Sequence, residues 1–164
     1  MRIISGTAKG TKLYTLEGLE TRPTLDRVKE SLFNIIYDKA IDSTVLDLFS
    51  GSGAIGLEFA SRGAKKVYLC DKSKDACKII EKNIEKTHLE EKVKLLNMDF
   101  IKTAIKELIE TEVLTEETLI IAETDEEERI TKQIEEFKGI EIVDKRKYGR
   151  AYVLFLKKMN GKEE

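Results

Sequence analysis

Three glycines give this sequence its most recognisable chemistry. Gly51, Gly53 and Gly56 form a G-x-G-x-x-G pattern in "VLDLFSGSGAIGLE", residues 45–58, between an apolar strand-like run and the start of a helix-like segment. Glycines in that position let backbone N–H groups approach a ligand with no Cβ in the way, which is typical of sites for nucleotides and adenosine cofactors. The pattern alone does not distinguish NAD from the other adenosine cofactors.

Three aspartates help to separate these cofactors. Asp47 lies four residues before the first glycine, where its charge would repel a pyrophosphate and attract an amino group or a sulfonium. Asp71 ends the run "KVYLCD" and can accept hydrogen bonds from ribose hydroxyls, and Asp99 ends "KVKLLNMD" and can bind the exocyclic amine of adenine. Helix capping is the alternative role of Asp71 or Asp99 taken singly. With the glycine loop, the three carboxylates favour S-adenosylmethionine over a dinucleotide.

The elements around these residues alternate in type. Strands are predicted at 44–49, 66–71 and 92–99, and helices at 53–63 and 73–88, the second capped by Ser73. Strand, helix, strand, helix, strand is typical of a parallel sheet wound by right-handed crossovers. The carboxyl ends of such strands, with their aspartates, converge on one crevice.

The remaining segments complete an α/β domain. Residues 118–124 read as a further strand, 126–139 as a helix and 140–158 as an antiparallel hairpin at the edge of the sheet, turning at Gly149. Residues 1–24 suggest a short hairpin, followed by a helix with Thr24 as its N-cap. We expect a single domain over 1–164, in which the N-terminal hairpin and helix occupy 1–40 and the Rossmann-like core occupies 44–158.

The composition limits the class of protein and its partners. With 41% apolar and 37% charged residues and no apolar run near the roughly 20 residues of a membrane helix, we expect a soluble cytoplasmic protein. Cys70 and Cys77 are too few for a disulfide framework and lack the spacing of a metal site, and His88 stands in a polar stretch, so no metal is expected.

Charge is distributed unevenly along the chain. Residues 1–40 carry seven basic and five acidic residues, whereas 107–128 carry ten acidic residues and no basic one. A mildly basic N-terminal region on an acidic body is compatible with a phosphate-backbone partner on one face, and ordinary surface scatter is the alternative.

The sequence also resembles a known family. "MRIISGTAKGTKLYTLEGLETRPTLDRVKESLFNII" followed by "VLDLFSGSGAIGLEFASRGAKKVYLCD" is similar to the bacterial RsmD-type ribosomal RNA methyltransferases, most specifically in the pairing of "RPT..RVKE" with "DLFSGSGAIGLE". The resemblance implies S-adenosylmethionine-dependent methyl transfer to the exocyclic N2 of a guanine in small-subunit (16S) rRNA. The substrate would be this RNA or an assembling small ribosomal subunit.

The same resemblance implies roles for individual residues. Asp47, Gly51 and Gly53 would bind the methionine moiety, Asp71 the ribose and Asp99 the adenine, with Ser50, Gly56, Lys72 and Phe100 completing the cofactor site. The side facing the RNA would include Arg2, Lys9, Lys12, Arg22, Thr24 and Arg27. Contacts between basic side chains and phosphates position RNA without reading its sequence.

One part of the family's pattern is missing. The family carries a strand that ends in Asp/Asn-Pro-Pro-Tyr or Phe, whose acceptor groups and aromatic ring hold the target amine, but the only proline here is Pro23. No catalytic residue can therefore be identified. If 102–114 is the helix that follows that strand, Phe100 and Ile101 must cross roughly 14 Å, the width of three strand spacings, although two residues reach only about 7 Å.

Three explanations are open for the missing strand and its Pro-Pro motif. The chain has lost a strand-loop-helix piece, so that 118–124 moves beside the first strand, or it exchanges elements with a second copy, or the written sequence joins residues that are not consecutive. We favour the last, with a break near 99–102, because removal of a central strand should expose a large apolar surface. A non-catalytic module that binds cofactor or RNA and a small-molecule methyltransferase are the alternative functions.

Overall fold

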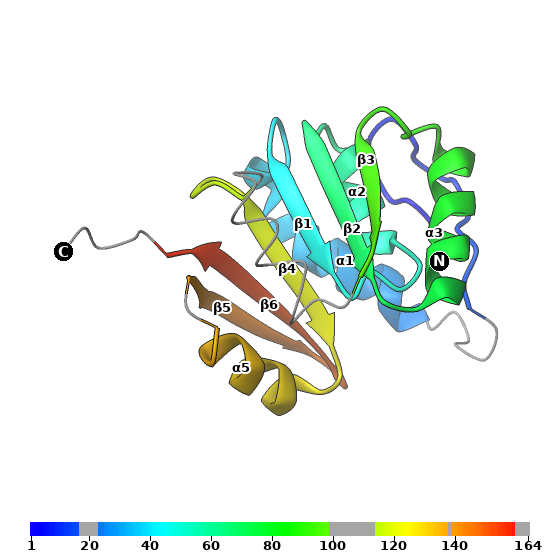
Figure 1. Ribbon diagram of the computed structural model, residues 1–164. Coiled ribbons are helices and arrows are strands. Elements are labelled where there is room, and N and C mark those ends of the chain that lie inside the picture. The colour runs from blue at the N-terminus through cyan, green and yellow to red at the C-terminus, as the bar shows by residue number, and fades with distance from the viewer. Residues whose placement is uncertain (17–22, 99–113, 138, 160–164) are drawn as a thin grey trace.

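A twisted sheet forms the centre of the computed structural model, which describes residues 1–16, 23–98, 114–137 and 139–159 (Figure 1). In that part of the chain the sheet has six strands in the order β3-β2-β1-β4-β6-β5. The strands are β1 (Thr44–Leu48), β2 (Lys66–Asp71), β3 (Val93–Asn97), β4 (Leu119–Thr124), β5 (Ile140–Tyr148) and β6 (Ala151–Lys158). The helices are α1 (Pro23–Ile35), η1 (Tyr37–Lys39), α2 (Ala54–Ser61), α3 (Lys74–Thr87) and α5 (Glu127–Glu135).

The strand pairing confirms the predicted mixed sheet. β1 pairs in parallel with β2 and β4, and β2 pairs in parallel with β3. β6 runs antiparallel to both β4 and β5, and Gly149, with φ 63°, makes the turn between the last two strands. The hairpin therefore closes one edge with β5 outermost, as the sequence predicts.

Both faces of β1 are covered, which explains its nearly continuous apolar sequence. Val45 packs in one cluster with Phe33 of α1 and Leu57 of α2. Leu46 and Leu48 point to the other face and pack in a second cluster that includes Ile130 and Ile134 of α5. The sheet thus lies between α1, α2 and α3 on one side and α5 on the other (Figure 1).

Two local predictions about the helices have different outcomes. Ser73 caps α3 as predicted, because its side chain accepts a hydrogen bond of 3.3 Å from the Ala76 N–H. The assignment of Thr24 as an N-cap is wrong, since α1 begins at Pro23 and Thr24 lies inside the first turn. Proline suits the first helical position, where its missing N–H would be unpaired in any case.

The N-terminal segment turns back on itself, but the predicted hairpin is reduced to one isolated antiparallel bridge between Arg2 and Lys12. The reason lies in the hydrogen bonds of its backbone. The N–H groups of Ile4 and Ser5 donate to the carboxylate of Glu58, at 2.8 and 3.0 Å, instead of to an opposing strand. The segment keeps hairpin bonds of its own, from the Ile3 N–H to the Thr11 carbonyl and from the Leu13 N–H to the Met1 carbonyl, both 3.0 Å, and is attached to α2 as well.

The position of β4 bears on the missing strand. Leu119–Thr124 pairs directly with β1, from Val45↔Leu119 to Leu48↔Ala122, which is the arrangement expected if a strand had been lost. The connection from β3 to β4 then comprises 98–118, so the crossing does not depend on Phe100 and Ile101 alone. The predicted break near 99–102 and the predicted helix at 102–114, apart from its last residue, lie outside the described residues.

Among the helices of the described ranges, none is long and apolar enough to cross a membrane. In the same ranges, no three His, Cys, Asp or Glu side chains are grouped so that they could hold a metal ion.

Candidate active site

The loop between β1 and α2 is built from backbone in the left-handed region. Phe49, Gly51 and Gly53 have φ of 58°, 59° and 78°. Such angles are unusual for phenylalanine and are found most often where the surrounding structure imposes them, as at functional sites. The loop therefore has a fixed and unusual shape at the carboxyl end of the central strand.

Ser50 holds this loop to the neighbouring strand. Its buried hydroxyl donates to the Asp47 carbonyl at 2.7 Å and accepts from the Cys70 N–H at 2.9 Å, while the Ser50 N–H donates to the Cys70 carbonyl at 3.0 Å. These contacts give Ser50 a role in shaping the loop. The role predicted for it, binding the cofactor, would act through that shape.

The glycines of the motif serve different purposes. A Cβ on Gly56 would lie 2.2 Å from Leu69 Cδ2, so this glycine lets α2 pack closely on β2. Among the described residues, a Cβ on Gly51 would meet only the Phe49 carbonyl oxygen, at 3.9 Å. Within that part of the chain, the backbone at Gly51 is consequently the part of the loop that is open to a ligand.

Two carboxylates, those of Asp47 and Glu123, lie near the carboxyl ends of β1 and β4. Asp47 is 2% exposed, and its Oδ2 accepts a 2.9 Å hydrogen bond from the Gly56 N–H. Burial raises the pKa of Asp47 to about 8, and the nearby charge of Glu123 adds to this effect. In the part of the chain that the structure describes, no cation stabilises the charge of this carboxylate.

Glu123 was missed by sequence reasoning. It is half-buried, lies two residues after Ile121 and so shares the face of β4 that packs with Val45, on the α1 side. Burial raises its pKa, and the positive charge of Lys29 opposes that rise. The signal that could have found it was a carboxylate directly after the apolar run of a fourth strand. With Asp47, it makes this end of the sheet suited to a cationic or amine-bearing ligand.

Asp71 closes the site on the β2 side. Its Oδ2 accepts from the Gly51 N–H at 2.9 Å and its Oδ1 from the Ser73 N–H at 2.8 Å. The carboxylate thus shapes the start of α3, as in the capping alternative, and also holds the glycine loop. Each oxygen can still accept a further bond, as the predicted ribose contact requires. Lys72 is exposed beside it, and Asp99 and Phe100 lie outside the described residues.

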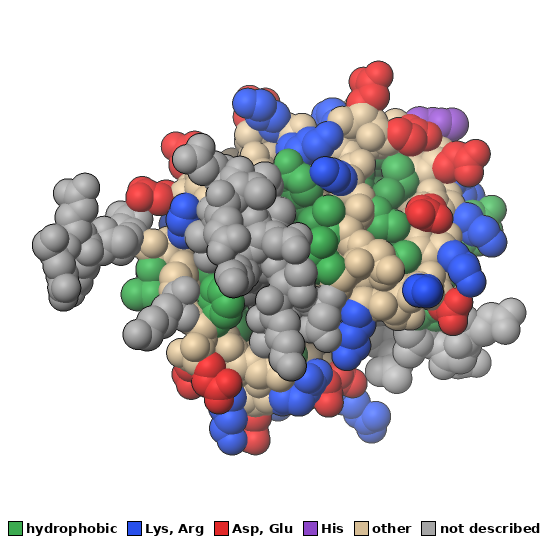
Figure 2. All heavy atoms as spheres, in the orientation of Figure 1, with side chains coloured by type: hydrophobic (Ala, Val, Ile, Leu, Met, Phe, Trp, Pro, Cys, Tyr) green, Lys and Arg blue, Asp and Glu red, His purple; other side chains and the backbone are tan. Residues whose placement is uncertain are grey.

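The basic residues predicted to face RNA are accessible but dispersed. Arg2, Lys9, Lys12 and Arg27 are exposed and form no ion pair with any carboxylate in the described ranges. Arg22 lies outside those ranges, and the side chain of Thr24 is not described. In the described part of the face shown in Figure 2, basic and acidic side chains are interspersed.

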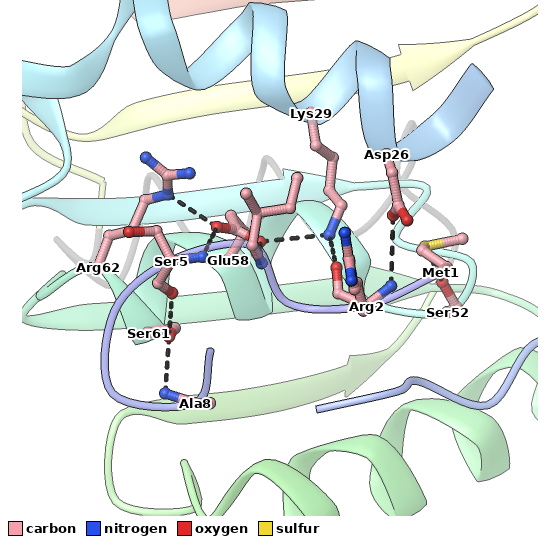
Figure 3. A network of polar contacts seen from close by, with 12 residues as sticks. Met1, Arg2, Ser5, Ala8, Asp26, Lys29, Ser52, Glu58, Ser61 and Arg62 are labelled. Atoms are coloured by element: carbon pink, nitrogen blue, oxygen red, sulfur yellow. Dashed lines mark hydrogen bonds and ion pairs between the residues drawn. The ribbon is translucent and has the colours of Figure 1, made fainter. Parts of the chain in front are cut away.

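These basic residues also lie at different distances from the glycine loop. Arg2 lies near the start of α1, where its N–H donates to Asp26 Oδ1 at 3.3 Å (Figure 3). Lys9 follows Ala8, whose N–H donates to Ser61 Oγ at 3.0 Å at the far end of α2. Eight residues of helix span about 12 Å, so Lys9 is displaced from the glycine loop by that length.

A buried ion cluster anchors the N-terminal segment, and sequence reasoning missed it as well. Glu58 of α2 is fully buried and lies 3.2 Å from Lys29 Nζ and 2.8 Å from Arg62 Nε (Figure 3). Lys29 also donates to the Arg2 carbonyl, and burial lowers the pKa of its ammonium. The signal that could have found the cluster was a single glutamate within an otherwise small and apolar helix.

Comparison with known proteins identifies relatives of this arrangement. A family model described as "Conserved hypothetical protein 95" matches residues 1–106. The putative rRNA methyltransferase YlbH of Bacillus subtilis is 42% identical over 89 residues, covering 54% of this chain and 48% of that protein. Ribosomal RNA small subunit methyltransferase D of Haemophilus influenzae is 40% identical over 106 residues, covering 62% and 55%. The chain spans about half the length of these curated relatives.

Solved structures share the fold over nearly the whole chain. A putative methyltransferase, yhhF, from Escherichia coli superposes with a TM-score of 0.66 at 26% identity, covering 96% of this chain and 97% of that one. The similarity extends beyond the glycine loop to the sheet that carries it.

Proposed function

This chain belongs to the family described as Conserved hypothetical protein 95, that of the RsmD-type rRNA methyltransferases, and from that membership we propose that it methylates small-subunit rRNA. The methyl donor would be S-adenosylmethionine and the acceptor the exocyclic N2 of a guanine, in 16S rRNA or in an assembling subunit. The observation that carries the proposal is the pair Asp47 and Glu123 beside the open backbone of Gly51.

The residues of the site divide into a cofactor side and a substrate side. S-adenosylmethionine supplies a methyl group bonded to a positively charged sulfur. Asp47 would bind the amino group of its methionine moiety, Gly51 would present its backbone, and Asp71 would accept from the ribose hydroxyls. A cation next to Asp47 would favour its ionised form, because the buried carboxylate lacks such a partner among the described residues.

Glu123 would act on the substrate side. Transfer requires the lone pair of the guanine N2 to point at the methyl carbon, and an acceptor on the N–H of that amine fixes this orientation. The half-buried carboxylate at the end of β4 would accept that hydrogen bond and then the proton that the nitrogen loses. Glu123 would thus substitute for part of the missing Pro-Pro motif.

A methyl-transfer assay tests the proposal. The chain would be incubated with S-adenosylmethionine carrying a labelled methyl group and unmodified small subunits or 16S transcript, and label in guanine N2 would be measured. Glu123→Gln should lower the rate by about 100-fold, as for loss of a general base, with little change in cofactor affinity. Asp38→Asn, which alters an exposed acidic residue after α1, is the matched control.

Other outcomes separate the alternatives. Binding of S-adenosylmethionine in calorimetry without transfer to either RNA substrate would favour a non-catalytic module. Absence of salt-sensitive RNA binding, tested at two ionic strengths, would favour a small-molecule methyltransferase. A version carrying a restored Asp-Pro-Pro-Tyr segment shows whether the missing motif limits the rate.

A further inference from the structure

Tyr14 is an exposed aromatic residue with an unusually well-fixed backbone. Its side chain is 48% exposed, yet its N–H donates to Asn83 Oδ1 at 2.7 Å and its carbonyl accepts from Asn83 Nδ2 at 2.9 Å. Asn83 belongs to α3 and is fully buried. A buried amide that satisfies both backbone groups of one residue holds that residue rigidly, since breaking either bond would leave a buried group unpaired.

The same amide reaches the glycine loop. Asn83 Nδ2 also donates to the Ser52 carbonyl at 2.9 Å, so both N–H groups of the amide are used. Tyr14 is thereby fixed relative to the loop that includes Gly51 and Gly53. The backbone that carries the Tyr14 ring is consequently held by the same amide that contacts the glycine loop.

A lysine side chain lies beside the Tyr14 ring. Lys86 Nζ lies 4.1 Å from the centre of the Tyr14 ring, and this lysine is exposed and has no acidic partner among the residues described. An exposed aromatic ring on a fixed backbone, with an adjacent ammonium, matches what single-stranded RNA offers, because every base has a face that can stack and every nucleotide has a phosphate. Lys12 and Arg2 are exposed on the same N-terminal segment.

We propose that Tyr14 stacks on an unpaired base of the RNA and that Lys86 contacts the adjoining phosphate. This inference rests on the proposed function, because it takes rRNA as the substrate. Because Asn83 links the backbone of Tyr14 to the glycine loop, stacking on this residue would help to place the RNA relative to the cofactor. The contact would tolerate any base and would contribute affinity and placement more than sequence specificity.

The test measures binding of an unmodified 16S transcript by four variants at two salt concentrations. Tyr14→Ala should raise the Kd by about 5- to 100-fold, the range for losing one stacked base, whereas Tyr14→Phe keeps the ring and should stay within about twofold of wild type. Lys86→Gln should reduce the slope of log Kd against log salt concentration by about one, the contribution of one phosphate contact. Tyr37→Ala is the matched control, since Tyr37 is 70% exposed in η1, after the far end of α1.

Calorimetry with S-adenosylmethionine and thermal melting accompany each variant and should give wild-type values. Equal RNA affinity of Tyr14→Ala and wild type, or an equal loss in Tyr37→Ala, would overturn the stacking contact. A loss seen with small subunits but not with the transcript would overturn it too, because the contact would then involve a protein. Wild-type chain that binds RNA but does not methylate it refutes the proposed activity alone, and wild-type chain that binds no RNA refutes both proposals.

Discussion

Gly51 and Asp71 are joined by a 2.9 Å hydrogen bond from the glycine N–H to Asp71 Oδ2, which ties the loop after β1 to the end of β2. Asp71 Oδ1 accepts a second bond, from the Ser73 N–H at 2.8 Å. One carboxylate thus fixes the start of α3 and the open part of the glycine loop. The predicted ribose ligand is at the same time a structural element of the site.

Asp71→Ala should therefore weaken S-adenosylmethionine binding by more than the loss of a ribose contact. Hydrogen bonds to a charged group contribute about 1.5–3 kcal/mol each, so loss of the ribose contact and of the bond to Gly51 predicts at least a tenfold rise in Kd. Isothermal calorimetry measures the effect. Asp75→Ala, at a residue whose side chain is 78% exposed, changes the charge equally and should leave the Kd unchanged. Equal affinities of the Asp71 variant and wild type for S-adenosylmethionine would exclude a role of Asp71 in binding this cofactor.

Asp47 should make stability depend on pH. Its pKa is about 8 in the folded protein, against an ordinary value of 3.8 for an exposed aspartate, so the folded state retains a proton that the unfolded chain has lost. The contribution of this group to the free energy of unfolding is therefore complete below about pH 4 and decreases as pH rises toward 8. Asp47→Asn should flatten the profile over this range in urea denaturation, and Asp38→Asn should not. An unchanged profile in the Asp47 variant would contradict the prediction.

Local patterns were enough to predict much of the fold. The strand Lys66–Asp71, the cap Ser73 and the turn at Gly149 each follow from a short-range signal, namely an apolar run, an N-cap residue or a glycine between two strands. Such signals act within a few residues and do not depend on the rest of the chain. The glycine loop was likewise predictable from a short-range signal, its G-x-G-x-x-G pattern.

Long-range contacts were not predictable in the same way. The position of β4 beside β1, one of three explanations that the sequence left open, is set by pairing across more than seventy residues, from Val45 to Leu119, for which no turn or periodicity gives a signal. The cluster of Glu58 with Lys29 likewise depends on two helices meeting. Glu123 was overlooked because its significance follows from its strand neighbour and not from its own sequence context.

Gly6 and Gly10 form a matched pair for testing the anchored N-terminal segment. Both have positive φ, 85° and 87°, but an added Cβ on Gly6 would lie 1.9 Å from the Ser61 carbonyl oxygen, whereas on Gly10 it would meet nothing within 4 Å. Gly10→Ala should cost about 1 kcal/mol, the cost of a left-handed conformation, and Gly6→Ala about 1–3 kcal/mol more for the clash. Urea denaturation measures both. Equal losses would mean that the segment does not pack against α2 as described.

The buried pair of Glu58 and Lys29 provides the strongest stability prediction. Glu58→Ala would leave the ammonium of Lys29 without its main partner and the N–H groups of Ile4 and Ser5 unpaired, and breaking a buried pair from one side costs about 3–5 kcal/mol. Replacing both groups, with Glu58→Gln and Lys29→Met, should cost less than the sum of these same two changes made singly, because the Lys29 ammonium is then not left buried without its carboxylate. A double-mutant cycle from urea denaturation gives the coupling energy. Additive effects would show that the two charges do not stabilise each other.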